Sequence, residues 1–258
     1  MFDYISTSHY GRCVKHRSNW YIKSVGLNRL YYVHSGSATI LLDSVPHELK
    51  PGKIYLFPQN LKFEPLLTEQ TNLDHTFFDF FSLPVIKMDS CIEIDPAEHP
   101  FIDHAARILF ELGATYHTYP YLDRNEYSDV VESYLNNTLF LIDKTFPIQT
   151  IGDHRINTAL EYIHKHYNEN ITLQTLTGIT NLEMNYFIRL FKQYMNATPY
   201  QYIKKYRFNI ALTLIKRKYP LSEVALRVGY ADISSFSHAF KKVFGFYPSE
   251  ILQDVSSP

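Results

Sequence analysis

Apolar side chains recur at helical spacing twice toward the end of the chain, within residues 171–252. In both stretches they fall at i, i+3, i+4 and i+7, which places them on one face of a helix. The first set is Phe187, Leu190, Phe191 and Tyr194, and the second is Phe236, Ala239, Phe240 and Val243. The same residue type recurs 49 positions later at three places, where Phe187, Phe191 and Pro199 have counterparts at Phe236, Phe240 and Pro248. The chain therefore contains an internal repeat of one structural motif.

Each repeat predicts a short helix, a turn and a longer helix. In the second repeat Gly229 marks the turn, and Asp232 is placed to cap a helix over residues 233–244. Asn196 and Gly245 follow the two longer helices, and both residue types adopt the left-handed conformation that ends a helix. A connecting helix is expected over residues 199–217. This is the helix-turn-helix design, in which the second helix lies in the major groove.

The outward faces of the two longer helices carry polar and basic side chains. We predict that nine of them contact DNA: Asn185, Ile188, Arg189, Lys192, Ser234, Ser235, His238, Lys241 and Lys242. Arginine suits guanine, asparagine suits adenine, lysines bind phosphates, and an apolar side chain can contact a thymine methyl. Basic residues on a helix are more often a solvated surface, and Ile188 can equally be an exposed apolar residue without a role. The same geometry in two repeats favours DNA contact.

Two segments carry a resemblance to a known family, VALRVGYADISSFSHAFKKVFGFYPSEI and its weaker copy LTGITNLEMNYFIRLFKQYMNATPYQYI. With the helix between them, they resemble the DNA-binding domain of AraC/XylS-type transcription regulators over residues 150–253. The resemblance implies two helix-turn-helix motifs on one linker helix, which read major-groove segments about 34 Å apart. It also implies double-stranded promoter DNA, a small-molecule effector and RNA polymerase as partners. Transcriptional activation, often of carbohydrate or stress genes, is the implied role.

The chain departs from the family pattern at three places. His238 stands where the second recognition helix usually carries an arginine, Glu183 where a serine cap is common, and Thr177 where alanine is usual. The first motif keeps its arginine, Arg189. We therefore expect the first motif to supply more base contacts and the second more contacts to the DNA backbone.

The first half of the chain is patterned differently, with short apolar runs separated by Gly and Pro. The predicted strands are residues 20–22, 30–33, 38–42, 54–58 and 74–83, with a break at residues 35–37. Such spacing indicates a β-barrel or sandwich. The segment YYVHSGSATILLDSVPHELKPGKIYLFPQN also resembles the cupin-like effector-binding barrel of many family members. The resemblance implies a ligand pocket in this barrel, and an aromatic-rich barrel with polar residues would suit a carbohydrate as the effector. The sequence does not assign the pocket residues, and Trp20 is equally a pocket or a core candidate.

Two helices follow the predicted strands. Residues 101–116 and 127–146 carry apolar stripes, with a break over residues 113–125. These stripes either pack on the barrel as a helical layer or form a homodimer interface, and we expect dimerisation through residues 101–146. The predicted organisation is α+β. A cupin-like effector-binding and dimerisation domain spans residues 1–147, a linker spans 148–153, and an all-α DNA-binding domain spans 154–258.

Charge separates the two halves. Residues 154–258 carry 13 Lys and Arg against 7 Asp and Glu, whereas residues 1–153 carry 12 against 19. A basic C-terminal half supports phosphate contact. The two cysteines, Cys13 and Cys91, predict neither a disulfide framework nor a metal cluster. Because the sequence shows no signal peptide and no long apolar run, we expect a cytoplasmic protein without a membrane span.

A barrel followed by a helical domain is also compatible with two function classes other than a regulator. A metal-dependent cupin-type enzyme would need clustered His and Glu ligands, and His34 and His47 lack an HxH pair with a following Glu. His164 and His166 form an HxH on a predicted helix, where positions i and i+2 point apart. We therefore expect no catalytic residue, metal site or cofactor. An adaptor that uses the barrel only for protein contacts is the remaining alternative.

Overall fold

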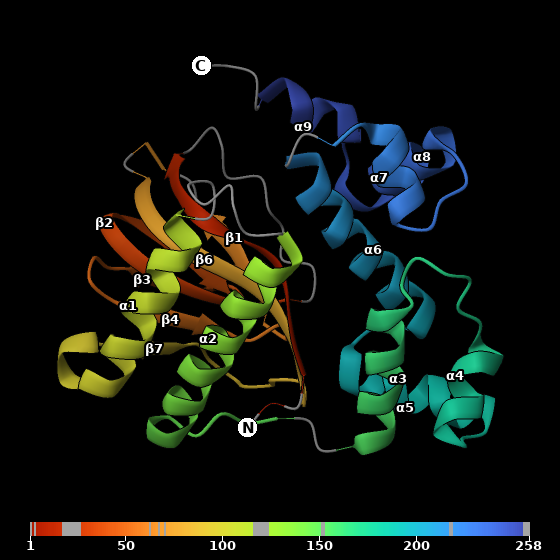
Figure 1. Cartoon of the computed structure of the whole chain (residues 1–258), viewed down its shortest axis with the longest axis horizontal. Helices are drawn as coiled ribbons and strands as arrows, with labels where there is room; N and C mark the ends of the chain where they lie inside the picture. Colours follow the sequence, from red (N-terminus) through yellow and green to blue (C-terminus); the bar gives the residue numbers. More distant parts are fainter. Residues whose placement is uncertain are drawn as a thin grey trace. The chain divides into compact units, whose positions relative to one another are not determined.

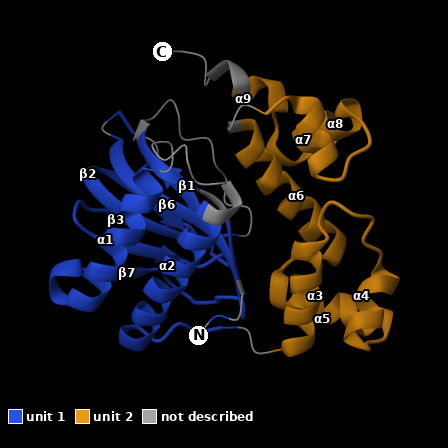
Figure 2. Cartoon of the chain, viewed as in Figure 1, with its two compact units in different colours: residues 1–152 blue, residues 153–258 orange. Residues whose placement is uncertain are grey.

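A computed structural model of the chain describes residues 2, 4–16, 27–61, 63–66, 68–69, 71–115, 124–150, 153–216 and 219–254. The chain divides into two compact units, residues 1–152 and residues 153–258, which we call the N-terminal and C-terminal domains (Figure 2). Trp20 and its predicted strand lie outside the described residues, as do residues 116–123 of the predicted break between the helices.

The N-terminal domain contains an antiparallel sheet of seven strands among its described residues (Figure 1). The strands are β1 (Tyr4–His16), β2 (Asn28–Leu42), β3 (Val45–Leu49), β4 (Ile54–Phe57), β5 (Phe63–Leu66), β6 (Asn72–Leu83) and β7 (Ile92–Ile94). The main path runs β1-β6-β2-β4-β7, and β3 and β5 both pair with the second half of β2. A short hairpin joins β2 to β3, whereas the neighbours on the main path are strands that are not consecutive in the sequence.

Strand β2 is continuous through the stretch where a break was predicted. Its first part pairs with β6 as far as Ser37, and from Ala38 onward it pairs with β3 and β5. Gly36 makes this passage possible, because it adopts a φ of 77° and a Cβ there would overlap the backbone carbonyl of Asn72. The predicted break at residues 35–37 was therefore wrong, since the glycine allows the strand to change partners without ending.

Helices α1 (Pro100–Thr115) and α2 (Arg124–Thr145) cover one face of the sheet (Figure 1). Their apolar stripes are buried against sheet residues such as Leu30, Leu56, Phe78 and Phe80. The buried stripe residues are Ile102, Ala105, Ala106, Leu109, Val131, Leu135, Leu139 and Ile142. Helix α1 continues past the predicted break point at Gly113, where an added Cβ would lie 2.5 Å from the Phe78 ring. The stripes therefore form a helical layer within one chain.

The outer faces of these helices carry a separate set of apolar side chains. Phe101 is 82% exposed, and Ile108, Val130 and Tyr134 are also exposed. Leu135, by contrast, lies in the core and is not accessible to a second copy. An interface through residues 101–146 would therefore have to use the outer faces of the helices.

The C-terminal domain is helical throughout its described residues. It contains α3 (His154–Lys165), α4 (Leu173–Thr180), α5 (Met184–Met195), α6 (Pro199–Lys216), α7 (Leu221–Arg227), α8 (Ile233–Phe244) and α9 (Pro248–Asp254). Helix α3 begins at His154 because Asp153 caps it by accepting a hydrogen bond from the Arg155 backbone N–H. Helix α8 has the predicted bounds. The predicted α+β class is confirmed.

Two sets of buried aromatic side chains hold the helices of this domain together. Phe187 and Phe191 from α5 are fully buried, and the Phe191 ring packs edge-on against Tyr202 of α6. Phe236 and Phe240 from α8 pack on Phe208 of α6 in a second cluster. Each motif therefore has its own small core on the shared helix α6. Within the described residues, none of the helices has the length and apolar character that crossing a bilayer requires.

Candidate nucleic-acid interface

Helix α5 presents the first predicted contact surface. Glu183 caps its start, where the carboxylate accepts a hydrogen bond from the Tyr186 backbone N–H at 2.9 Å, and Asn196 ends it with a φ of 50°. Because Phe187, Leu190 and Phe191 face the core, the opposite side of the helix faces solvent. Asn185, Arg189 and Lys192 are exposed there, and Ile188 is half-buried.

Helix α8 is built in the same way. Asp232 accepts a hydrogen bond from the Ser235 backbone N–H at 2.7 Å, and Gly245 ends the helix with a φ of 88°. Asp232 and Gly245 lie 49 positions after Glu183 and Asn196, so the repeat extends to both caps. The exposed residues are Ser234, Ser235, His238, Lys241 and Lys242.

One of these exposed residues already has a structural role. The Ser235 hydroxyl donates a hydrogen bond to Asp232 Oδ2 at 2.8 Å, in addition to the backbone bond. These hydrogen bonds lower the pKa of Asp232 and keep it ionised at the start of the helix. The Ser235 hydroxyl therefore retains only acceptor capacity toward DNA, whereas Ser234 contributes to the cap through its backbone N–H.

An aromatic residue that the sequence analysis did not select supports Arg189. The guanidinium carbon of Arg189 lies 5.4 Å from the centre of the Tyr186 ring, and that of Arg155 on α3 lies 5.8 Å from the same ring. Asp153 holds Arg155 through two hydrogen bonds of 3.1 and 2.8 Å, which raise the pKa of Arg155. The i, i+3 spacing of Tyr186 and Arg189 is a signal that could have identified this contact, but the approach of Arg155 depends on tertiary packing.

A second missed residue plays a similar part in the second motif. Lys241 Nζ lies 3.9 Å from the centre of the Tyr247 ring, and the His238 and Tyr247 ring centres are 6.3 Å apart. Tyr247 follows the left-handed turn at Gly245, so the chain reverses and brings its ring against the exposed face of α8. Each recognition helix thus has a basic side chain resting on a tyrosine, a contact that orders a cation before it meets a phosphate or a base.

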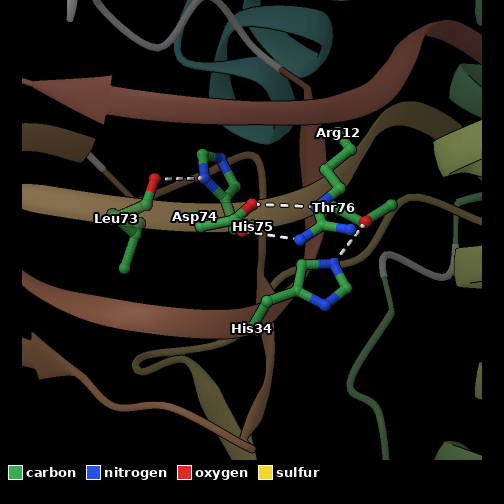
Figure 3. Close-up of polar contacts among 6 residues, drawn as sticks. All are labelled: Arg12, His34, Leu73, Asp74, His75 and Thr76. Carbon is green, nitrogen blue, oxygen red and sulfur yellow. Dashed lines mark hydrogen bonds and ion pairs between the residues drawn. The ribbon is translucent and has the colours of Figure 1, made fainter.

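Polar side chains also gather in the N-terminal domain, on strands β1, β2 and β6 (Figure 3). Arg12 pairs with both carboxylate oxygens of Asp74 at 3.0 and 2.6 Å, and His34 Nε2 lies 2.8 Å from Thr76 Oγ1. The hydrogen bond from Arg12 lowers the pKa of Asp74, while burial and the charge of Arg12 lower the pKa of His34. These hydrogen bonds pair Arg12 of β1 with Asp74 of β6, and His34 of β2 with Thr76 of β6. The side chains therefore link the three strands.

The other face of the sheet holds a buried aromatic cluster that includes Tyr31, Phe57, Phe63 and Phe77. The buried ion pair of Arg29 and Asp79, with an Nε–Oδ1 distance of 3.2 Å, lies beside it. The Arg29 guanidinium carbon is also 4.9 Å from the centre of the Phe63 ring. Among the described residues, no group of three or more His, Cys, Asp or Glu is arranged to hold a metal ion.

Two helix-turn-helix motifs on one helix, each with a polar and basic exposed face, define a class of DNA-binding domain. Residues 176–254, which run from α4 to α9, match a family described as "Helix-turn-helix domain". The C-terminal domain therefore contains a helix-turn-helix domain of the AraC type, which confirms the resemblance for this part of the chain.

Relatives with sequence similarity are named as regulators. The chain is 30% identical over 164 residues to "Probable transcriptional regulator LumQ" of Photobacterium leiognathi, covering 62% of each chain. It is 30% identical over 98 residues to the transcriptional regulatory protein HptR of Staphylococcus aureus, covering 38% of this chain and 39% of that one. The chain therefore spans less than two thirds of the length of either relative.

The fold of the whole chain is similar to that of ToxT from Vibrio cholerae. The TM-score is 0.61 at 14% sequence identity, with 98% of both chains covered. Another structure of ToxT, with a TM-score of 0.60, contains (E)-4-(8-methylnaphthalen-1-yl)but-3-enoic acid, and a third, with a TM-score of 0.50, contains an unsaturated fatty acid. At this level of identity the likeness concerns the fold.

Proposed function

We propose that this protein is a sequence-specific DNA-binding transcription regulator. One observation carries the proposal: α5 and α8 expose the same kinds of side chain at positions 49 residues apart, between equivalent caps. Arg189 and His238 occupy one such pair of positions, and Lys192 and Lys241 another. Solvent exposure alone gives no reason for the same side-chain arrangement to recur in both motifs. Binding to two successive major-groove segments does, because each segment presents the same geometry to its helix.

Fluorescence anisotropy tests this proposal directly. The purified full chain is titrated against its own upstream DNA and against a scrambled sequence, across a salt series. We expect tighter binding to the upstream DNA and a steep salt dependence, because bound lysines and arginines release counterions. Arg189→Ala should bind the upstream and the scrambled DNA with more nearly equal affinity. Arg107→Ala is the matched control, because Arg107 is an exposed arginine of the N-terminal domain paired with Asp103. Equal, weak binding to both DNAs, with and without cell extract, would contradict the proposal.

The regulator responds to a small molecule bound by the N-terminal domain. Support comes from the fold likeness to ToxT and from the aromatic face of the sheet beside Arg29. A carbohydrate was the first candidate from the sequence. The buried aromatic side chains and the guanidinium of Arg29 beside them suit an apolar carboxylic acid better, since a sugar needs many hydrogen-bonding partners.

A thermal-shift screen separates these ligand classes. An unsaturated fatty acid, the alcohol of the same chain length and a panel of sugars are compared, because a ligand that binds only the native state raises the melting temperature. We expect a shift with the acid and a smaller one with the alcohol. A rise in melting temperature with sugars alone would show that the ligand is a carbohydrate and not a carboxylic acid. No shift with any compound would favour the adaptor alternative, and metal found by elemental analysis of the purified protein would reopen the enzyme alternative.

The protein acts as an activator and as a homodimer. Dimerisation would use the exposed outer faces of α1 and α2, where Phe101, Ile108, Val130 and Tyr134 lie. A dimer can engage two half-sites whose spacing matches its symmetry. In vitro transcription with purified RNA polymerase tests the sign of regulation, and lower transcript levels on adding the protein would make it a repressor.

A further inference from the structure

A three-residue stretch of the loop between α3 and α4 is held from helix α6. Arg207 donates hydrogen bonds to two backbone carbonyls of this loop, from Nε to Tyr167 O at 2.5 Å and from Nη2 to Glu169 O at 2.6 Å. The Tyr206 ring, one residue earlier on α6, packs edge-on against Tyr167 with ring centres 5.6 Å apart. Because a guanidinium presents its donors in a rigid plane, this contact fixes the direction of the loop as well as its position.

The second motif touches the same stretch through its turn. Gly229, between α7 and α8, has a φ of 79°, and a Cβ added there would lie 2.5 Å from Asn168 O and 2.9 Å from Asn168 C. Both are backbone atoms, so no side-chain movement could make room. Gly229 is therefore required for its conformation and also for the close approach of the second motif to the loop of the first.

These five residues, Tyr167, Asn168, Glu169, Arg207 and Gly229, form what we call the intermotif junction. Helix α6 connects two small cores, one around Phe191 and the other around Phe240. With the intermotif junction, the two motifs are joined twice, by the helix and by the loop. Two connections restrict rotation of one body against another far more than a single helix does.

We propose that the intermotif junction sets the separation and angle of α5 and α8, and thereby makes the domain selective for the spacing of the two DNA segments it reads. Spacing selectivity rests on the proposed DNA-binding function. The rigidity of the domain does not, so the two can be tested separately.

The first experiment contains no DNA. Spin labels are placed on the full chain at Gln193→Cys on α5 and Ser249→Cys on α9, both exposed positions outside the nine predicted contacts, in a background with Cys13→Ser and Cys91→Ser. Pulsed dipolar spectroscopy then gives the distance distribution. We expect one narrow peak for this background and a shifted or broadened one with Gly229→Ala.

Gly245→Ala is the matched control for Gly229→Ala. Gly245 also has a positive φ, of 88°, but nothing lies within 4 Å of its added Cβ. Both variants carry the strain of a left-handed alanine, and only Gly229→Ala meets the other motif. Arg207→Lys serves as a second variant if Gly229→Ala does not fold, because lysine keeps the charge and loses the two-donor plane. Unchanged distance distributions in both Gly229→Ala and Arg207→Lys would contradict the proposal that the junction sets the separation of the two motifs.

The second experiment measures affinity for the upstream DNA with one base pair inserted between the two segments. The insertion moves the second segment by about 3.4 Å along the axis and about 35° around it. We expect wild type and Gly245→Ala to lose at least about tenfold in affinity, and Gly229→Ala and Arg207→Lys to lose markedly less. Equal losses in all four proteins would contradict the proposed selectivity. A wild type with no preference among DNA sequences would contradict the proposed regulator function. The distance distributions would then still test whether the junction fixes the separation of the two motifs.

Discussion

Arg189 rests on the ring of Tyr186, with its guanidinium carbon 5.4 Å from the ring centre. The two residues are one helical turn apart on α5, and Arg155 approaches the same ring from α3. A cation held over an aromatic ring at an exposed site gains about 0.5–1 kcal/mol. The contact therefore orders the arginine that we predict to read a base.

Replacing Tyr186 should weaken sequence discrimination without removing a charge. Tyr186→Ala is expected to lower the affinity ratio of upstream to scrambled DNA by about two- to fivefold, the value of one exposed cation–π contact. Tyr186→Phe keeps the ring and should stay close to wild type. Anisotropy titrations at one salt concentration measure both. Equal ratios for the two variants would show that the ring does not position Arg189.

The first motif is expected to supply most of the contacts to bases, and the second most of the contacts to the DNA backbone. Arg189→Ala should lower discrimination by about 1–3 kcal/mol, the value of a bidentate contact to guanine. Lys241→Gln and Lys242→Gln should each reduce the slope of log K against log salt by about 1, with little loss of discrimination. His238→Ala should also leave discrimination largely intact. Equal losses in Arg189→Ala and His238→Ala would contradict this division.

Burial of His164 predicts that the C-terminal domain loses stability in mild acid. His164 Nε2 lies 2.8 Å from the Tyr202 hydroxyl, its ring stacks on Tyr206, and burial lowers its pKa well below the usual value. In the unfolded chain histidine titrates near pH 6.5. Below that pH the unfolded state binds a proton that the folded state excludes, so the free energy of unfolding falls by up to about 1.4 kcal/mol per pH unit.

Urea unfolding of the full chain between pH 7.5 and pH 5 measures this effect. The control is the double variant His164→Phe with Tyr202→Phe, which removes the titrating group and its partner while keeping two stacked rings. Only the difference between the two proteins is informative, because burial raises the pKa of Glu132 in the N-terminal domain and gives an opposite trend. A constant difference across the pH range would mean that His164 is not a neutral core residue.

Substitutions on the two faces of helix α2 should affect different properties, stability on the buried face and dimerisation on the exposed face. Leu135 is fully buried against the sheet, so Leu135→Ala is expected to destabilise the N-terminal domain by about 2–5 kcal/mol, and Leu135→Asp by more. Tyr134 is 36% exposed, so Tyr134→Asp should leave the N-terminal domain folded and shift the mass from dimer to monomer. Light scattering at micromolar concentration measures the mass, with Ser133→Ala, at an exposed neighbour, as the control. An unaltered dimer in Tyr134→Asp would exclude this face.

Local chemistry made much of the C-terminal domain predictable. The bounds of α8 followed from Asp232 and Gly245, because a cap and a left-handed turn act within a few residues of the chain. The inward positions of Phe187 and Phe191 followed from helical spacing, and so did the outward position of Arg189. Strand β2 was less predictable. The Ser-Gly-Ser sequence has the composition of a turn, and its continuity depends on pairing with residues distant in the chain.

The sequence by itself determined the repeat, the two recognition helices and their exposed side chains, because periodicity and capping are properties of neighbouring residues. Tertiary structure alone decided what lies against them. It placed Arg155 on Tyr186, packed the stripes of α1 and α2 on their own sheet, and brought Gly229 against Asn168. Those contacts join residues that are far apart in sequence, so they arise only when the packed elements bring distant backbones within van der Waals distance.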